Sequence, residues 1–159
     1  MIKLVASDLD GTLLHNYQQT VPKEIYDTIK ALHEKGIIFT AASGRQYANI
    51  RRLFAPLGFD IPYIAENGSM CVYKEEILAT GLTPSKTIRH ILDALMEYRK
   101  IYHTGHCILS VKDTYYSDST DERFIDYMEN DMHNIVTYVP DLYAIKEPII
   151  KAAICDFGG

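Results

Sequence analysis

The chain has 159 residues, of which 47% are hydrophobic, and its formal net charge at pH 7 is −5. An apolar fraction of this size is typical of a globular protein and argues against disorder. The acidic balance argues against a nucleic-acid-binding surface, which needs a basic stripe, but it allows a locally positive pocket for a small phosphorylated molecule.

The cysteines and the apolar runs bear on the cellular compartment in which the protein is found. Cys71, Cys107 and Cys155 are odd in number and far apart in the sequence, which is typical of reduced thiols. The first residues show no signal-peptide pattern, and no apolar run is as long as a membrane span. We therefore expect a cytoplasmic protein without membrane segments.

The first 65 residues alternate between short apolar runs and amphipathic stretches. Apolar runs at 2–7, 37–42 and 61–65 predict strands. Apolar residues at helical spacing predict one helix between Thr20 and Gly36 and a second from about Gln46 to Pro56. Strands and helices that alternate in this way are typical of a doubly wound parallel α/β fold.

After Gly68 the pattern changes to that of an α+β unit. We expect hairpins at 69–80 and 107–116, helices at 84–100 and 121–130, and strands at 135–139 and 149–154. The pattern predicts two domains, residues 1–82 and residues 83–159.

Polar side chains follow each of the first three predicted strands. Asp8 and Asp10 follow the first strand, Ser43 and Arg45 the second, and Asn67 the third. In doubly wound folds, ligands bind where the carboxyl ends of the strands meet. The sequence therefore predicts a ligand site at this edge.

Asp8 and Asp10 are the candidates for chemistry. Two carboxylates at a strand end can bind Mg²⁺, and one of them can attack phosphorus while the other acts as general acid and base. Gly11 permits a tight turn whose backbone N–H groups can hold phosphate oxygens. On the pair of aspartates alone, simple capping of a turn is the better explanation of the pattern.

Three longer strings separate these interpretations. Asp8-Leu9-Asp10-Gly11-Thr12-Leu13-Leu14 resembles the first motif of the haloacid dehalogenase-like (HAD) phosphatases. Ala42-Ser43-Gly44-Arg45 and Glu66-Asn67-Gly68 are similar to later motifs of their Cof-type branch. The resemblance implies a Rossmann-like doubly wound parallel core, incomplete here, with an inserted α+β cap domain.

The resemblance also implies roles for individual residues. Asp8 would be the nucleophile and bind Mg²⁺, and Asp10 would be the general acid and base and offer its backbone carbonyl to the metal. Arg45 would contact the substrate or have a structural role. The implied phosphate-binding and pocket-shaping set is Leu9, Gly11, Thr12, Ser43, Gly44, Arg45 and Asn67.

Two motifs that the resemblance implies were not found. They are a lysine after the cap and a second acidic pair that completes the Mg²⁺ site; we interpret Lys151 as a cap residue. We therefore expect the chain to be the first part of a longer protein, with weak or no activity alone. The strand at 2–7 would then have an exposed apolar edge, which predicts a dimer or larger assembly.

Three functions remain open at this point. The first is a Mg²⁺-dependent phosphatase of small monoesters such as sugar or cofactor phosphates. The second is a sugar phosphotransferase or mutase on the same scaffold, and the third is a catalytically inactive binding or assembly module. His103, His106 and Cys107 fit no standard zinc spacing, and we interpret them as surface histidines beside a thiol.

Overall fold

The computed structural model describes residues 1–15 and 18–157 of the chain. The chain divides into two compact units, Met1–Thr80 and Gly81–Gly159. The boundary predicted from the sequence, after residue 82, lies two residues from this division.

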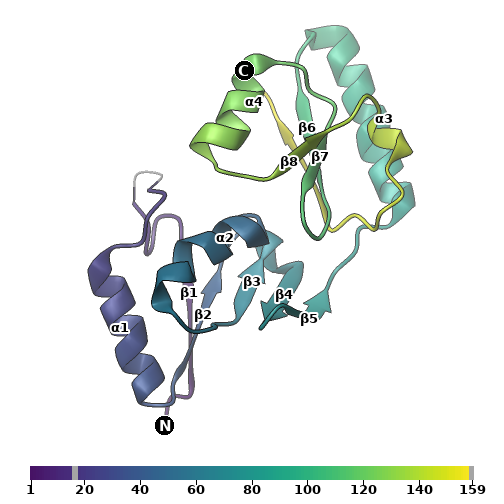
Figure 1. The fold of residues 1–159 in the computed structure, drawn as a ribbon. Coiled ribbons are helices and arrows are strands. Elements are labelled where there is room, and N and C mark those ends of the chain that lie inside the picture. The colour runs from purple at the N-terminus through teal and green to yellow at the C-terminus, as the bar shows by residue number, and fades with distance from the viewer. Residues whose placement is uncertain (16–17, 158–159) are drawn as a thin grey trace. The chain divides into compact units, whose positions relative to one another are not determined.

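The first unit contains a five-stranded sheet with the order β1-β2-β3-β4-β5 (Figure 1). Strands β1, β2 and β3 are parallel to one another, β4 is antiparallel to β3, and β5 is antiparallel to β4. The elements predicted for this half are confirmed, with shifts of a few residues at their ends. In chain order they are β1 (Leu4–Asp8), α1 (Lys23–Glu34), β2 (Ile38–Ala42), α2 (Tyr47–Phe54), β3 (Tyr63–Ala65), β4 (Met70–Tyr73) and β5 (Glu76–Thr80).

Helices α1 and α2 cover the same face of this sheet. The parallel strands are added in one direction, and right-handed crossovers then place both connecting helices on one side. Phe54 of α2 packs on Phe39 of β2 with ring centroids 5.8 Å apart. The Tyr26 hydroxyl of α1 donates a hydrogen bond of 2.6 Å to the Leu53 carbonyl of α2, so the two helices form one layer.

The opposite face is apolar and exposed near β1, which is an edge strand of the sheet. Leu4 and Ile38 are register partners on β1 and β2, and their exposed fractions are 54% and 51%. Parallel strands are usually buried on both faces, and an edge strand presents unpaired backbone groups. The exposed apolar edge predicted from the sequence is therefore present among the described residues.

We expect this surface to drive self-association at micromolar concentrations. Light scattering coupled to gel filtration should give a mass above that of one chain, and Leu4→Lys should shift the mass toward the monomer because edge charges oppose strand pairing. Leu78→Lys, on the other edge strand β5, is the matched control. A stable monomer at all concentrations, or dissociation by Leu78→Lys alone, would contradict the prediction.

The second unit has a four-stranded sheet with the order β8-β7-β6-β9. β6 is antiparallel to β7 and β9, and β7 is parallel to β8. The hairpin and the long helix predicted here are confirmed. The elements are α3 (Ser85–Tyr102), β6 (His106–Ser110), β7 (Tyr115–Ser117), α4 (Glu122–Asp126), β8 (Val136–Tyr138) and β9 (Lys151–Cys155).

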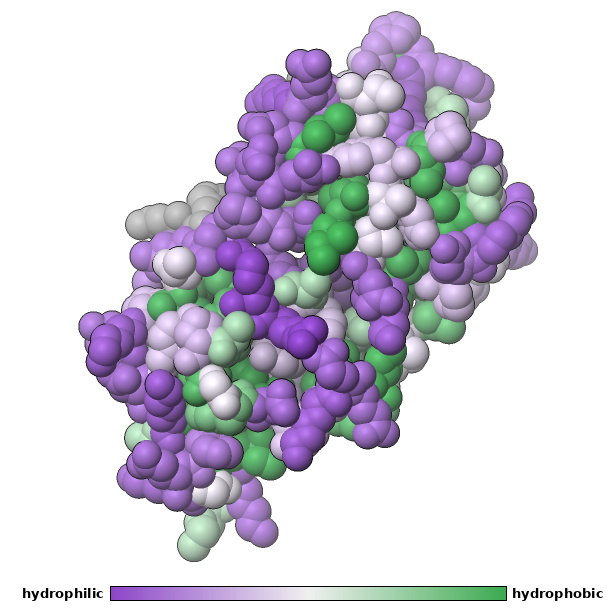
Figure 2. Space-filling view, viewed as in Figure 1, coloured by the Kyte–Doolittle hydropathy of each residue, from purple (hydrophilic) through white to green (hydrophobic). Residues whose placement is uncertain are grey.

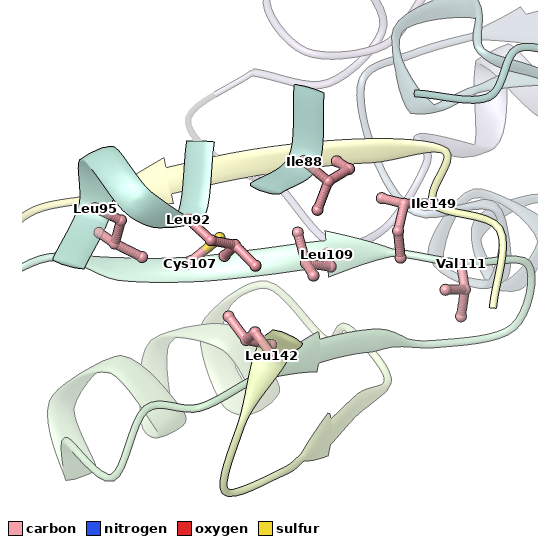
Figure 3. Packing of buried hydrophobic residues seen from close by; sticks show 8 residues of the cluster. All are labelled: Ile88, Leu92, Leu95, Cys107, Leu109, Val111, Leu142 and Ile149. Carbon is pink, nitrogen blue, oxygen red and sulfur yellow. The ribbon is translucent and has the colours of Figure 1, made fainter. Parts of the chain in front are cut away.

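One side of this sheet packs against α3 and forms the main core of the unit (Figure 3). The core consists of apolar side chains from α3, from β6 and from the segment that precedes β9. Such a cluster shows that residues 81–157 bury a hydrophobic core of their own. Its members are Ile88, Leu92, Leu95, Cys107, Leu109, Val111, Leu142 and Ile149.

The helix predicted over residues 121–130 is confirmed, and the structure adds that the helix changes type at Tyr127. Asp121 caps α4 by accepting hydrogen bonds from the backbone N–H groups of Arg123 and Phe124 at 2.8 and 3.3 Å. After Asp126 the chain continues as a π-helical turn, Tyr127–Asp131. The turn is closed by the Met132 N–H, which donates to the Tyr127 carbonyl at 2.9 Å.

Apolar residues also reach the surface of each unit, where they lie among polar side chains (Figure 2). Within residues 1–15 and 18–157, no helix is both long enough and apolar enough to cross a bilayer.

Candidate active site

The register of the parallel strands brings the predicted site residues to one edge of the first sheet. Asp8 at the end of β1 pairs with Ala42 at the end of β2, and Ala42 pairs with Ile64 of β3. The chain then leaves the sheet at Ser43, whose N–H donates to the Ile64 carbonyl at 2.8 Å. The strand-end clusters therefore meet at one edge, as the alternating pattern predicts.

The loops after β2 and β3 are joined directly to each other. The N–H of Asn67 donates to the Ser43 carbonyl and that of Glu66 to the Arg45 carbonyl, both at 3.2 Å. Glu66 and Asn67 have positive φ angles of 54° and 58°. A Cβ atom added to Gly44 would lie 2.3 Å from the Asn67 side-chain oxygen, so only glycine allows this approach.

The chain after β1 forms a tight turn around the Leu9 carbonyl. This carbonyl accepts hydrogen bonds from the N–H groups of residues 12–14 at 2.8–3.1 Å, and the Leu9 side chain is buried in the core. The N–H of Gly11, whose φ is +80°, donates to the Leu14 carbonyl, and the N–H of Leu9 donates to Asp8 Oδ1. Both N–H groups implied for phosphate binding have acceptors within the chain, so phosphate would have to replace these acceptors.

Asp8 and Ser43 retain polar atoms for a ligand. The Asp8 side chain is exposed, and its Oδ2 atom has no hydrogen-bond partner among the described residues. The Ser43 hydroxyl accepts a hydrogen bond from the Arg45 N–H at 3.2 Å, and across the described part of the chain its proton has no acceptor. A carboxylate oxygen and a hydroxyl donor thus lie at adjacent strand ends, which suits attack on a bound phosphoryl group.

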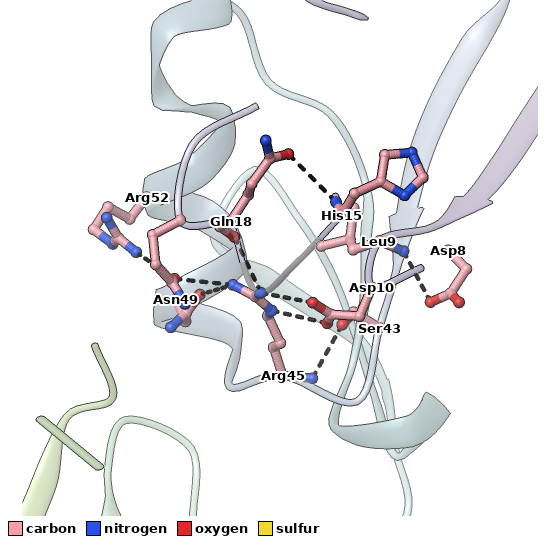
Figure 4. A network of polar contacts seen from close by, with 10 residues as sticks. Asp8, Leu9, Asp10, His15, Gln18, Ser43, Arg45, Asn49 and Arg52 are labelled. Carbon is pink, nitrogen blue, oxygen red and sulfur yellow. Dashed lines mark hydrogen bonds and ion pairs between the residues drawn. The ribbon is translucent and has the colours of Figure 1, made fainter. Parts of the chain in front are cut away.

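The Asp10 carboxylate faces Arg45, while Asp8 lies outside this pair (Figure 4). Arg45 Nε donates to Asp10 Oδ2 at 2.9 Å, and the Arg45 Nη2 atom donates to Asp10 Oδ1 at 2.6 Å. The exposed fraction of the Arg45 side chain is 5%, against 48% for Asp10. Of the two roles considered for Arg45, the structure favours the structural one.

Three residues around Arg45 were not predicted from the sequence. The Arg45 Nη1 atom donates to Gln19 Oε1 at 3.1 Å and to Asn49 Oδ1 at 3.3 Å, and Nη2 donates to the Gln18 carbonyl at 3.4 Å. Asn49 lies in α2 and follows Arg45 by four residues, and this short separation was the one available signal. Gln18 acts through its backbone, so its side-chain type carries no signal.

Comparison with known proteins decides the family. The family model of the haloacid dehalogenase-like hydrolases matches residues 5–157. The chain belongs to this family.

The proteins similar to this chain include phosphatases. Phosphoglycolate phosphatase 1 of Saccharolobus solfataricus is 39% identical over 77 residues, which cover 48% of this chain and 34% of that protein. A haloacid dehalogenase-like hydrolase from B. subtilis has the same fold, with a TM-score of 0.75 and 21% identity over 93% of this chain and 59% of that one. The subclass IIB sugar phosphatase BT4131 gives a TM-score of 0.71 and 22% identity over 94% of this chain and 57% of that one. The chain therefore covers between about a third and three fifths of the length of these relatives.

The candidate active site contains hard oxygen atoms that could form part of a Mg²⁺ site. The free oxygen of Asp8 and the backbone carbonyl of Asp10 are suitable donors, and Mg²⁺ commonly keeps several waters beside one or two protein ligands. Within residues 1–15 and 18–157, no group of three or more His, Cys, Asp or Glu side chains could hold a metal ion. Asp8 is the better placed carboxylate of the two aspartates, because both oxygens of Asp10 accept hydrogen bonds from Arg45.

Residues 103–107 do not form part of a metal-binding group of three or more His, Cys, Asp or Glu side chains within the described part of the chain. The interpretation of His106 as a surface residue is wrong: its ring is buried, stacks on Phe124 with centroids 4.6 Å apart, and hydrogen-bonds through Nδ1 to Ser119 Oγ at 2.9 Å. Burial raises the pKa of the adjacent Cys107 thiol to about 12. Cys107 is thus a core residue and not a nucleophile.

Proposed function

We propose that this chain supplies the nucleophile half of a Mg²⁺-dependent phosphatase that hydrolyses small phosphate monoesters, such as sugar or cofactor phosphates. The observation that carries the proposal is the pairing of Asp8 with Ala42, which brings the Asp8 carboxylate, with one free oxygen, and Ser43, the residue after Ala42, to adjacent strand ends. The names of the relatives, phosphoglycolate phosphatase and sugar phosphatase, support this substrate class. The three free cysteines agree with a cytoplasmic location.

The proposed reaction has two steps at phosphorus. An Asp8 oxygen attacks the phosphorus and forms an aspartyl-phosphate, while the bond to the leaving oxygen breaks and Asp10 gives that oxygen a proton. Asp10 then takes a proton from water, the water oxygen bonds to phosphorus, and the bond to Asp8 breaks to release phosphate. The Ser43 hydroxyl donates to a phosphoryl oxygen in both steps.

Mg²⁺, when bound by Asp8 and the Asp10 carbonyl, would supply positive charge against the phosphoryl oxygens. The sequence contains neither the lysine motif nor the second acidic pair that the resemblance implies. We therefore propose that turnover by this chain alone is slow, since less positive charge then faces the phosphoryl group.

Hydrolysis of p-nitrophenyl phosphate by homogeneous protein tests this proposal. We expect slow release of phosphate that requires Mg²⁺, stops with EDTA and is lost in Asp8→Asn. The matched control is Asp60→Asn, an exposed aspartate outside the site, which should keep the wild-type rate. Hydrolysis that survives Asp8→Asn would contradict the proposal, and phosphate transfer to an added sugar would favour the phosphotransferase.

A further inference from the structure

Arg45 has a buried guanidinium at the edge of the candidate site, and all of its N–H groups donate hydrogen bonds within the chain. A guanidinium has five N–H donors, and each of the five has an acceptor here. Two donors reach the two oxygens of Asp10, and the others reach Gln18, Gln19 and Asn49. No donor remains for a substrate phosphate.

The acceptors of Arg45 come from three separate segments. Asp10 lies in the turn after β1, Gln18 and Gln19 lie ahead of α1, and Asn49 lies in α2. Arg45 itself is fixed through its backbone, because its N–H donates to Ser43 Oγ and its carbonyl accepts from the Glu66 N–H. The guanidinium therefore has one defined position relative to the strand ends.

A bidentate pair fixes the plane of a carboxyl group as well as its place. Asp10 is half exposed, so one side of its carboxyl group meets solvent while the other is held by a guanidinium that is almost fully buried. A group that exchanges protons with a leaving oxygen and with water needs this combination of access and fixed orientation.

We propose that Arg45 is the positioning residue of Asp10, and that its task is to hold the acid–base group rather than to bind substrate phosphate. The inference rests on the proposed function, since it assumes that Asp10 acts on an aspartyl-phosphate at Asp8. It assigns Arg45 to proton transfer and removes it from the phosphate-binding set.

The test follows the decay of the phosphoenzyme made from 2,4-dinitrophenyl phosphate, whose leaving group needs no proton. Formation of the aspartyl-phosphate should then be nearly independent of Asp10, whereas its hydrolysis requires Asp10 as base. We expect Arg45→Met to slow the decay about 10- to 100-fold, with formation within about 3-fold of wild type. The phosphoenzyme fraction should therefore rise.

Three variants serve as comparisons. Asp10→Asn should slow the decay at least as much, and adding Arg45→Met to it should have no further effect. Arg45→Lys should not restore the decay, because an ammonium lacks the planar fork. Arg52→Ala is the matched control, since Arg52 also donates to Gln19 Oε1, at 3.3 Å, but does not contact Asp10; its decay should be unchanged.

The outcomes separate the inference from the function. Absence of any phosphoenzyme on wild-type Asp8 would overturn the proposed function and the inference with it. A phosphoenzyme that decays at the wild-type rate or faster in Arg45→Met would overturn the inference alone. Equal loss of formation and decay would show that Arg45 only supports the fold, and would also overturn it.

Discussion

Borohydride reduction of protein quenched during turnover is expected to convert Asp8, and no other aspartate, to homoserine. The reagent reduces an acyl phosphate but not a free carboxylate, so the product marks the residue that carried phosphate. Asp8 is the expected position because its Oδ2 atom is free, whereas both oxygens of Asp10 are held by Arg45. Mass spectrometry of the peptide that contains both residues shows which position has become homoserine.

The control for this experiment is Asp8→Asn, in which the signal should disappear completely. Asp10→Asn should keep the signal, because the attacking carboxylate is intact and removal of the phosphoryl group is slowed. Homoserine at position 10, or a signal that persists in Asp8→Asn, would assign the nucleophile to another residue and contradict the proposed mechanism.

Leu92→Ala is expected to destabilise the second unit by about 2–5 kcal/mol, the range for removing a buried leucine side chain. Leu92 projects from α3 into the main core and is 3% exposed. For a domain of this size, each kcal/mol lowers the melting temperature by roughly 4–8 °C, so a shift of at least about 8 °C is expected. Thermal unfolding followed by far-UV circular dichroism measures it.

Ile101→Ala is the matched control for this prediction. It removes a side chain of the same size from the same helix, but Ile101 is 68% exposed, so the expected change is within about 0.5 kcal/mol. Similar shifts for the two variants would show that the cluster around Leu92 does not hold the unit together.

The place of the candidate site could be predicted because it depends on backbone periodicity. Apolar runs separated by amphipathic helices imply parallel strands, and parallel strands bring Asp8, Ser43 and Asn67 to one edge whatever the details of packing. The register between Asp8 and Ala42 confirms this part. The order of the elements in the second unit was likewise readable from alternating apolar positions.

The partners of the site residues could not be predicted, because they depend on side-chain direction. Spacing alone allows Asp10 to face the same cleft as Asp8, and only the fold shows that it faces Arg45, 35 residues later. The burial of His106 was missed for a similar reason, since its neighbours Phe124 and Ser119 are contributed by segments beyond its own hairpin.

The contact between Gly44 and Asn67 has a consequence for the evolution of such chains. Because a Cβ atom at position 44 would overlap the Asn67 side-chain oxygen, a larger residue at position 44 requires the Asn67 side chain to move or to be replaced. The two positions, 23 residues apart in the sequence, should therefore vary as a pair when homologous sequences are aligned. A library that randomises both positions together should recover folded variants that separate randomisation of position 44 does not.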